Sequence, residues 1–572
     1  MFYFNDFKKI IFIVFFVSFG FLANNVAANI GEAIKFNVDK GFDFNNRSEV
    51  IATLVKTNAN FYFYVENQWW ASQTESQKNE TLTNLDDLSQ EFASNIYPRL
   101  TSVFGKEWNP GVDGDSKITV LFHSMNSSEG GYFRTADEYV NLQVPDSNER
   151  EMLYLSLDEI NSSNLKRLLA HEFVHLITFN QKNKKYKIEE ETWLNEARAD
   201  YSSEILGYDD EYSGSNLETR VRDFVANPSD SITEWSATKY DYASIAIFTR
   251  YLADHYGVNI LMDSLDSEYV GIESINYALL KSGAKEKFDQ IFTNWTIALA
   301  LNNCSIDKKY CYLNENLRGL KITPSLNFVP ITGNASLSVN DFLKSWTGRW
   351  LKFIGGSGDL ELTFSSPTAL TFKIPYIIED KNGVQQVKFL ILNSTSQGKI
   401  TVENFSDEYR SIIIIPSLQT RTIGLDEIEP FYPFTYSIFT SGGEETEEQI
   451  IIQQLLQKIS ILKSEIAKLQ NKNNISNTTN NSSLCLQITQ NLYIGINHNN
   501  QVKCLQEFLK SQGGNIYPEG YITGNFGEFT KNAVIKFQEK YSSEILKPYG
   551  LLGGTGYVGE KTRQKINQLL SV

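Results

Sequence analysis

Residues 168–179, LLAHEFVHLITF, carry two histidines spaced four positions apart inside an apolar run. On a helix, residues four apart share one face, so the imidazoles of His171 and His175 point toward one position, with Glu172 beside them. The apolar neighbours cover the other faces, as a buried helix requires. Because the whole chain has only five histidines, a chance pairing is improbable. The stretch predicts a helix that binds a metal ion.

A third metal ligand is predicted from the segment 193–200, WLNEARAD. Glu196 follows His175 by 21 positions, which is enough chain for a helix, a turn and a second helix to bring it back. Zinc accepts nitrogen and oxygen donors in a catalytic site that keeps one position open. Asp200 lies one helical turn beyond Glu196, where it is expected to accept a hydrogen bond from the non-ligating nitrogen of a zinc histidine.

The two motifs together resemble those of the gluzincin metallopeptidases, the thermolysin-like group with HExxH followed by Asn-Glu-x-x-x-Asp. The resemblance is carried by His171, Glu172, His175, Asn195, Glu196 and Asp200. It implies an α+β catalytic domain that hydrolyses peptide bonds with one Zn²⁺ ion, held by the two histidines and Glu196. It also implies that Glu172 is the general base that takes the proton of the attacking water.

Residues 242–252, YASIAIFTRYL, resemble the aminopeptidase branch of the gluzincins, in which a catalytic Tyr precedes a Tyr-Leu pair at this spacing. By that resemblance Tyr242 is the first choice for a second donor to the oxyanion, with Tyr240 and His255 behind it. The Gly-x-Met-Glu-Asn motif of that branch does not precede HExxH, which favours an endopeptidase. Upstream, residues 117–122 and 130–133 are expected to supply a strand and a rim of the cleft, and the resemblance to gluzincins implies that an extended substrate pairs with such an edge strand.

The N-terminus indicates export. Lys8 and Lys9 precede an apolar run, and residues 26–28 offer small side chains for cleavage, so residues 1–28 are predicted to be a signal peptide. The run is shorter than the roughly 20 residues that span a membrane, although an uncleaved anchor is the alternative. No later segment looks transmembrane. The mature protein is therefore expected to be secreted, extracellular or associated with a bacterial cell wall.

Composition narrows the function classes further. The formal net charge of −16 argues against nucleic acid as the main partner. Hydrophobic residues make up 41% of the chain and aromatic residues 13%, so wholesale disorder is excluded. The four cysteines fit an oxidising compartment, with one local bridge between Cys304 and Cys311 and another between Cys485 and Cys504. Free buried thiols are the alternative.

The sequence predicts several domains in series. Residues 29–319 mix strand-like and helix-period runs and form the predicted zinc metallopeptidase domain. Residues 320–440 change to short alternating or β-branched runs separated by turn residues, which predicts a β-sandwich domain and a turn-rich connector. An accessory or docking role for this domain is suggested by its position alone.

Residues 441–470 are predicted to form a helical or coiled-coil spacer, because apolar residues follow the a/d spacing of a coiled coil. A dimer through the 450–470 helix and a single-helix spacer both remain open. Residues 471–483 are rich in Asn, Ser and Thr and predict a flexible linker. A helical spacer of roughly 40 Å and this linker would together hold the predicted metallopeptidase domain clear of a cell wall that is bound by residues 484–572.

Residues 484–572 contain an internal repeat: GNFGEFT at 524–530 recurs as GYVGEKT at 556–562, 32 positions later. Each copy is a Gly turn that leads into a helix. The segment resembles the peptidoglycan-binding domain type 1, a small three-helix module, which implies peptidoglycan or cell wall as a partner. The 517–526 loop is a candidate for ligand contacts. A helical bundle kept for protein contacts, or an inhibitory propiece, is the alternative.

These features together predict a secreted zinc-dependent endopeptidase that acts on proteins or peptides and is tethered to the cell wall by its C-terminal module. Two rivals remain: a hydrolase of peptide cross-links in peptidoglycan, and a non-catalytic wall-attached scaffold with a vestigial zinc site. The intact Glu172 argues against the scaffold, because a protein without catalysis has no need of a general base.

Overall fold

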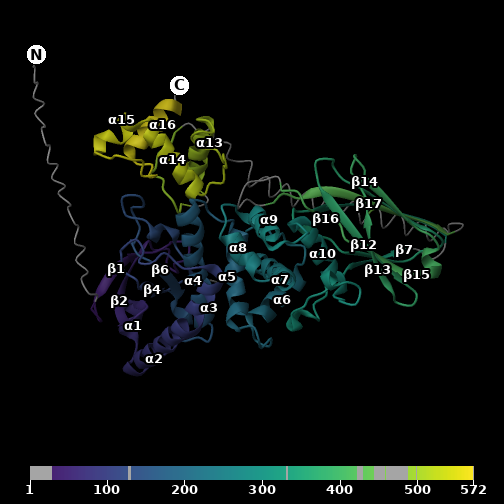
Figure 1. Ribbon diagram of the computed structural model, residues 1–572, viewed down its shortest axis with the longest axis horizontal. Helices are drawn as coiled ribbons and strands as arrows, with labels where there is room; N and C mark the ends of the chain where they lie inside the picture. The colour runs from purple at the N-terminus through teal and green to yellow at the C-terminus, as the bar shows by residue number, and fades with distance from the viewer. Residues whose placement is uncertain are drawn as a thin grey trace, which may run out of the picture.

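The computed structural model describes residues 29–126, 130–329, 333–421, 429–442, 458, 487–496 and 499–570 (Figure 1). The predicted signal peptide, the predicted linker and nearly all of the predicted spacer, with its dimerisation helix, lie outside the described residues. Within the described part of the chain, no helix combines the length and the apolar character needed to cross a membrane.

The N-terminal part is built on one six-stranded mixed sheet, in the order β1-β2-β3-β4-β6-β5. Strand β4 pairs in parallel with β3 and with β6, and all three are almost wholly buried, as central parallel strands must be. The short strand β5 runs antiparallel to β6 at the edge. The strands are β1 (Ala33–Asn37), β2 (Glu49–Thr57), β3 (Phe61–Glu66), β4 (Ile118–His123), β5 (Gly131–Tyr132) and β6 (Met152–Ser156).

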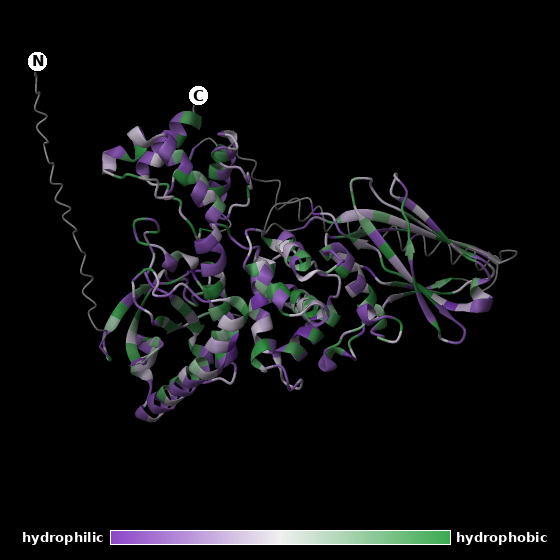
Figure 2. Cartoon of the chain, in the orientation of Figure 1, coloured by the Kyte–Doolittle hydropathy of each residue, from purple (hydrophilic) through white to green (hydrophobic). Residues whose placement is uncertain are grey.

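Helices cover this sheet and continue beyond it as a helical region, all sharing one hydrophobic core (Figure 1). Helix α4 is buried along most of its length, and α5 packs against it. Figure 2 shows the hydrophobic residues gathered on the sheet and the inner helices, with hydrophilic residues along α2. The helices are α1 (Asn67–Ser72), α2 (Glu75–Glu91), α3 (Tyr97–Phe104), α4 (Leu165–Thr178), α5 (Thr192–Leu206), α6 (Asn216–Ala226), α7 (Lys239–Tyr256), α8 (Asn259–Leu265), α9 (Gly271–Ser282) and α10 (Phe288–Leu301).

The segment that joins α4 to α5 is held in place by a buried lysine. Helix α4 runs on into a π-helical stretch, Phe179–Lys184, rather than ending in a turn. Within it, the fully buried Lys182 donates to the carbonyl oxygens of Ser264 and Ser267, at 2.8 and 2.9 Å, beside the end of α8. A cation at the end of a helix is favoured by the helix dipole. Burial lowers the pKa of Lys182 to about 8.

A second region consists of two β-sheets that share one core, in which Phe353 packs on Tyr436 and Phe364 on Phe434. One sheet has the order β7-β10-β15-β12-β16-β9, with β13 beside β12, and the other has the order β14-β11-β17-β8. A disulfide between Cys304 and Cys311 lies just before this region. The strands are β7 (Ser325–Val329), β8 (Gly333–Leu343), β9 (Thr347–Gly348), β10 (Leu351–Gly355), β11 (Leu360–Ser365), β12 (Phe372–Asp380), β13 (Gln385–Leu390), β14 (Gln397–Val402), β15 (Tyr409–Ile414), β16 (Ser417–Leu418) and β17 (Tyr432–Gly442), with the short helix α11 (Phe405–Glu408) before β15.

The C-terminal domain contains the helices α13 (Asn500–Ser511), α14 (Glu528–Lys540), α15 (Ser542–Ile545) and α16 (Glu560–Leu570). The predicted 32-residue repeat has a structural basis. Buried Gln506 accepts from the backbone N–H of Gly524, and buried Gln538 accepts from that of Gly556 in the same way. Each glutamine amide also donates to the threonine that follows its glycine turn. The predicted Cys485–Cys504 bridge cannot be described, because Cys485 lies outside the described residues.

The C-terminal domain packs directly against the N-terminal part, which differs from the wide separation that a spacer and linker suggest (Figure 1). Tyr139 and Phe179 belong to the same hydrophobic core as Leu492 and Phe526. Tyr139 donates a hydrogen bond to the carboxylate of Glu528. The reason for the difference is physical: the connecting chain is long enough to fold back, and the contact buries apolar side chains.

Candidate metal centre

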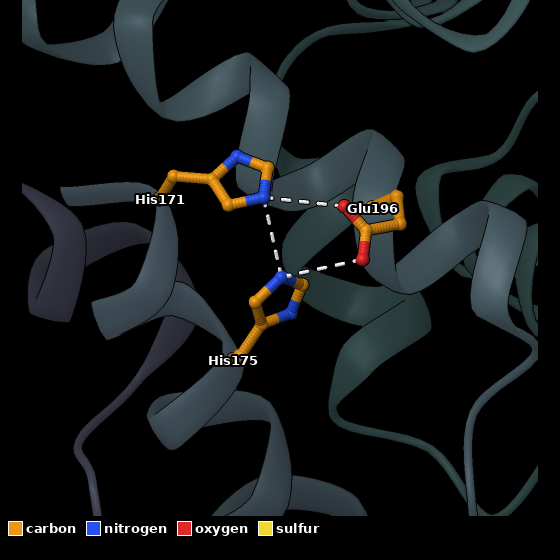
Figure 3. Close-up of side chains that lie close together, drawn as sticks. All are labelled: His171, His175 and Glu196. Atoms are coloured by element: carbon orange, nitrogen blue, oxygen red, sulfur yellow. Dashed lines mark hydrogen bonds and ion pairs between the residues drawn. The ribbon is translucent and has the colours of Figure 1, made fainter. Parts of the chain in front are cut away.

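The structure brings His171, His175 and Glu196 together, as Figure 3 shows. The two histidines lie on α4 and the carboxylate on α5. The His171 Nε2 atom lies 3.2 Å from one carboxylate oxygen of Glu196, and the His175 Nε2 atom lies 3.4 Å from the other. The two Nε2 atoms are 3.3 Å apart. Two imidazole nitrogens and one carboxylate, with either of its oxygens, are therefore gathered around one point.

These spacings fit a tetrahedral ion. Two ligand atoms at about 2.0–2.1 Å from a tetrahedral zinc ion lie about 3.3–3.4 Å from each other. The separation of the two Nε2 atoms, 3.3 Å, matches that edge length, and each Nε2 atom lies 3.2 or 3.4 Å from a different oxygen of the Glu196 carboxylate. Among the described residues, this is the one group of three or more His, Cys, Asp or Glu side chains close enough to hold a metal ion. The donor set of two imidazoles and a carboxylate suits zinc.

Glu196 and the two histidines alter one another's pKa values. Burial disfavours the charged form of His171, but its hydrogen bond to Glu196 and the nearby carboxylates raise its pKa overall. For His175, burial dominates and lowers the pKa, which favours the neutral form that ligates metals. Burial raises the pKa of Glu196, yet the two histidines together lower it overall.

An asparagine orients one of the histidines. The Oδ1 atom of Asn195 lies 3.1 Å from Nδ1 of His175, so it can accept the proton on that nitrogen and leave Nε2 free to ligate. The sequence marks Asn195 as part of the motif but assigns it no contact. Its position directly before Glu196 on α5 places the orienting group and the third ligand on one helix.

Asp200 does not make the contact predicted for it. Its carboxylate accepts instead from Asn216, from Nε of Arg220 at 2.9 Å and from Nη1 of Arg250 at 3.1 Å. Burial alone would raise its pKa, but the two guanidinium groups hold the pKa of Asp200 well below its usual range. The physical reason for the difference is that α6 and α7 bring two arginines closer to this carboxylate than any histidine. Asp200 thus joins three helices behind the metal site.

Glu172 follows His171 on α4 and lies close to the edge strand β5. Its side chain is buried. A β-carbon added to Gly131 of β5 would lie 2.8 Å from the carbonyl oxygen of Tyr154 and 3.2 Å from Cγ of Glu172, so Glu172 lies close to the backbone of this strand. The proximity places Glu172 next to β5, the last strand in the order of the described sheet. The predicted strand and rim upstream correspond to β4 and β5.

The three predicted oxyanion donors all lie on α7 and make different contacts. Tyr242 lies at the start of α7, with its ring against Trp235 and 4.8 Å from the guanidinium of Arg220. Through Arg220 it is linked to Asp200, one turn from Glu196. His255 instead contacts the carbonyl oxygen of Cys311, at the disulfide loop. Tyr240 is covered by the ammonium group of Lys239.

A cavity of about 190 Å³ lies elsewhere, at the contact between the N-terminal part and the C-terminal domain. Its walls include Trp108, Tyr139, Lys184 and Lys531. None of the three predicted metal ligands lines it. The cavity therefore belongs to the domain contact rather than to the metal centre.

Comparison with known proteins gives two matches that bear on the function of this chain. Residues 498–566 match the family of the putative peptidoglycan binding domain. The neutral metalloprotease ShpI of Staphylococcus hyicus is 27% identical over 271 residues, covering 42% of this chain and 57% of that protein. The chain therefore spans little more than half the length of this relative. The two matches support a metallopeptidase region combined with a peptidoglycan-binding domain.

Comparison with solved structures carries no argument, because the TM-scores are far too low. The pre-peptidase C-terminal domain of a Bacillus anthracis collagenase has a TM-score of 0.14 at 7% identity, covering 20% of this chain and 94% of its own. A surface-associated copper-binding protein of Methylomicrobium album has the same score and identity, covering 20% and 98%. PliG, a periplasmic lysozyme inhibitor from Aeromonas hydrophila, has a TM-score of 0.13 at 9% identity, covering 20% and 97%.

Proposed function

We propose that this protein is a secreted, zinc-dependent endopeptidase that hydrolyses peptide bonds of proteins. The observation that carries the proposal is the convergence of His171, His175 and Glu196. The two Nε2 atoms lie 3.3 Å apart, each lies 3.2 or 3.4 Å from an oxygen of the Glu196 carboxylate, and Glu172 is buried on the same helix as the histidines. The partial similarity to a neutral metalloprotease supports the same class of reaction.

Each side chain has a role in this proposal. The two histidines and Glu196 hold the ion, which when bound supplies Lewis-acid polarisation of the scissile carbonyl and of the attacking water. Glu172 takes the proton of that water and passes it to the leaving amine. Tyr242 is the proposed donor to the developing oxyanion. An extended substrate would pair with the free edge of β5, next to Glu172.

The C-terminal domain supports a location of the protein at the cell wall. Its similarity to peptidoglycan-binding domains supports attachment to the cell wall through residues 484–572. The same similarity favours a second candidate, a hydrolase of the peptide cross-links of peptidoglycan. The two candidates share the metal centre and differ in substrate.

One experiment separates the candidates. Purified protein is incubated with casein and with purified peptidoglycan, with and without a chelator, and the released peptides are measured. Chelator-sensitive cleavage of casein is the expected result. Release of wall peptides without cleavage of casein would favour the hydrolase of peptidoglycan cross-links over the endopeptidase. No metal-dependent activity on either substrate would favour the non-catalytic wall-attached scaffold.

Variants test the roles directly. Glu172→Gln should keep about one zinc per chain and lose activity by roughly 10²–10⁴-fold, because it keeps all three ligands and removes the base. Glu196→Ala should lose the metal. Glu273→Gln, an exposed carboxylate on α9, is the matched control and should behave like the wild type. Full zinc in Glu196→Ala would contradict the assigned ligand set.

A further inference from the structure

The cavity at the contact between the N-terminal part and the C-terminal domain has a volume of about 190 Å³ and charged walls. One wall carries Glu138 and Lys184 of the N-terminal part, and another carries Glu528 and Lys531 of α14. Small molecules bind preferentially in clefts at contacts between domains. A cavity of about 150 Å³ in another protein holds benzene, so this one is large enough for a small organic molecule.

Two carboxylates in these walls have buried oxygen atoms that lack a donor. Glu138 and Glu528 are each 1% exposed, and both line the cavity. Among the described residues, no hydrogen bond reaches either carboxylate oxygen of Glu138 or the Oε2 atom of Glu528. The other oxygen of Glu528 accepts from the hydroxyl of Tyr139. Because a buried acceptor without a donor is costly, the arrangement favours a ligand that supplies N–H groups.

The pKa of Glu138 is consistent with this need for a positive group. Burial raises the pKa well above its ordinary value, and the charge of Glu151 raises it further. Lys184 lowers the same pKa, but too little to offset the burial. A positive group of a ligand in the cavity would therefore stabilise the ionised carboxylate.

Lysines supply the opposite charge in the same walls. The ammonium group of Lys184 lies 3.2 Å from the ring centre of Trp108, which also lines the cavity. Lys531 lies over the ring of Tyr139, at 3.8 Å, and pairs with Glu528 at 3.4 Å. Among the described residues, Lys184 forms no such ion pair. The cavity is therefore lined by an unpaired carboxyl group and by an ammonium group that contacts only an aromatic ring.

We propose that this cavity binds a free α-amino acid with a small side chain, whose ammonium group contacts Glu138 and whose carboxylate contacts Lys184. The N–H donors of an ammonium group suit the unpartnered oxygens of Glu138 and Glu528. A carboxylate gives Lys184 a charge-assisted hydrogen bond. Glycine, alanine and serine are close to benzene in size and fit the volume. None of the three predicted metal ligands lines the cavity, so the site does not depend on the proposed peptidase function.

Isothermal titration calorimetry of the full chain with glycine, alanine and serine tests the site. Metal-free protein is used, so that amino acids cannot bind to an ion at the metal centre. At least one of the three should bind. Its N-acetylated analogue and its amide should each bind at least about 10-fold more weakly, because each lacks one of the two charges. No binding of any of the three at millimolar concentrations, or equal binding of the amino acid and either analogue, would overturn the proposal.

Variants assign the binding to this cavity. Glu138→Gln keeps the shape of the side chain and removes its charge, so it should weaken binding at least about 10-fold, and Lys184→Gln should do the same. The matched controls are Glu80→Gln, at an exposed position of α2, and Lys185→Gln, directly after Lys184 and exposed. Both controls should bind the amino acid like the wild type.

Small-angle X-ray scattering of each variant checks that the two domains stay in contact. The same radius of gyration as in the wild type is expected, so that a loss of binding reflects the removed charge. Unchanged binding in Glu138→Gln or in Lys184→Gln would overturn the assigned contacts, whether or not the protein is an active peptidase.

Discussion

Asn195 illustrates how a single side chain decides which nitrogen of a metal-binding histidine is available. Its carbonyl oxygen contacts Nδ1 of His175, so the other ring nitrogen faces Glu196. The spacing of His171, Glu172, His175 and Glu196 was enough to predict from sequence which groups converge. The partner of Asp200 could not be predicted, because Arg220 and Arg250 lie 20 and 50 positions away on other helices.

Asn195→Ala should therefore weaken the binding of zinc without removing a ligand. Loss of an orienting contact of this kind typically costs about 10–100-fold in metal affinity. Competition with a chromogenic zinc chelator measures the change. Asn79→Ala, an exposed position on α2, is the control and should bind zinc like the wild type. An unchanged affinity in Asn195→Ala would show that the contact with His175 does not matter for the metal.

At the scale of elements, the strands were easier to predict than the connection between the metal helices. The strand expected upstream of the HExxH motif is β4, and the short alternating or β-branched runs of residues 320–440 include β11 and β15. The π-helical stretch after α4 leaves no comparable pattern, because it depends on Lys182 reaching the carbonyl groups beside α8. Contacts of this kind, between residues far apart in the sequence, cannot be predicted from the local periodicity of apolar residues.

A buried glutamine holds each of the two glycine turns of the C-terminal domain. Gln538→Leu should destabilise the domain by roughly 3 kcal/mol or more, because the N–H of Gly556 and the carbonyl of Tyr557 lose their partner in a buried place. Hydrogen exchange in α14 and α16 measures the loss in the full chain. Gln564→Leu, on the exposed face of α16, is the control. Equal protection in both variants would contradict a structural role for the buried glutamine.

For the whole molecule, the sequence predicted which regions exist but not which regions touch. Tyr139 and Phe179 look like ordinary core residues, and only the structure shows that part of their core comes from the C-terminal domain. Burial and the charge of Glu528 raise the pKa of Tyr139 far above its usual value, so its hydroxyl stays a donor to that carboxylate. Asn532 and Lys187 add a further hydrogen bond across the contact.

Tyr139→Ala should release the C-terminal domain from the N-terminal part. The substitution removes the hydrogen bond to Glu528 and a large buried ring, which typically costs about 3–5 kcal/mol in a core. The radius of gyration from small-angle X-ray scattering should increase. Tyr186→Ala, whose hydroxyl contacts Asp266 outside this contact, should leave it unchanged. The same radius in Tyr139→Ala and the wild type would mean that the ring does not hold the domains together.

Under the proposed function, the direct domain contact would also change how often a substrate meets the metal centre. For a module on a flexible tether, the effective concentration of a captured substrate falls roughly as the −3/2 power of tether length. Here the C-terminal domain contacts Phe179 and Glu189, which border the connection between the two helices that carry the metal ligands. Under the proposed function, a wall fragment bound by the docked domain would keep a constant distance from the metal centre. Peptide bonds at that distance would meet the metal centre at high local concentration, and bonds at other distances would not reach it.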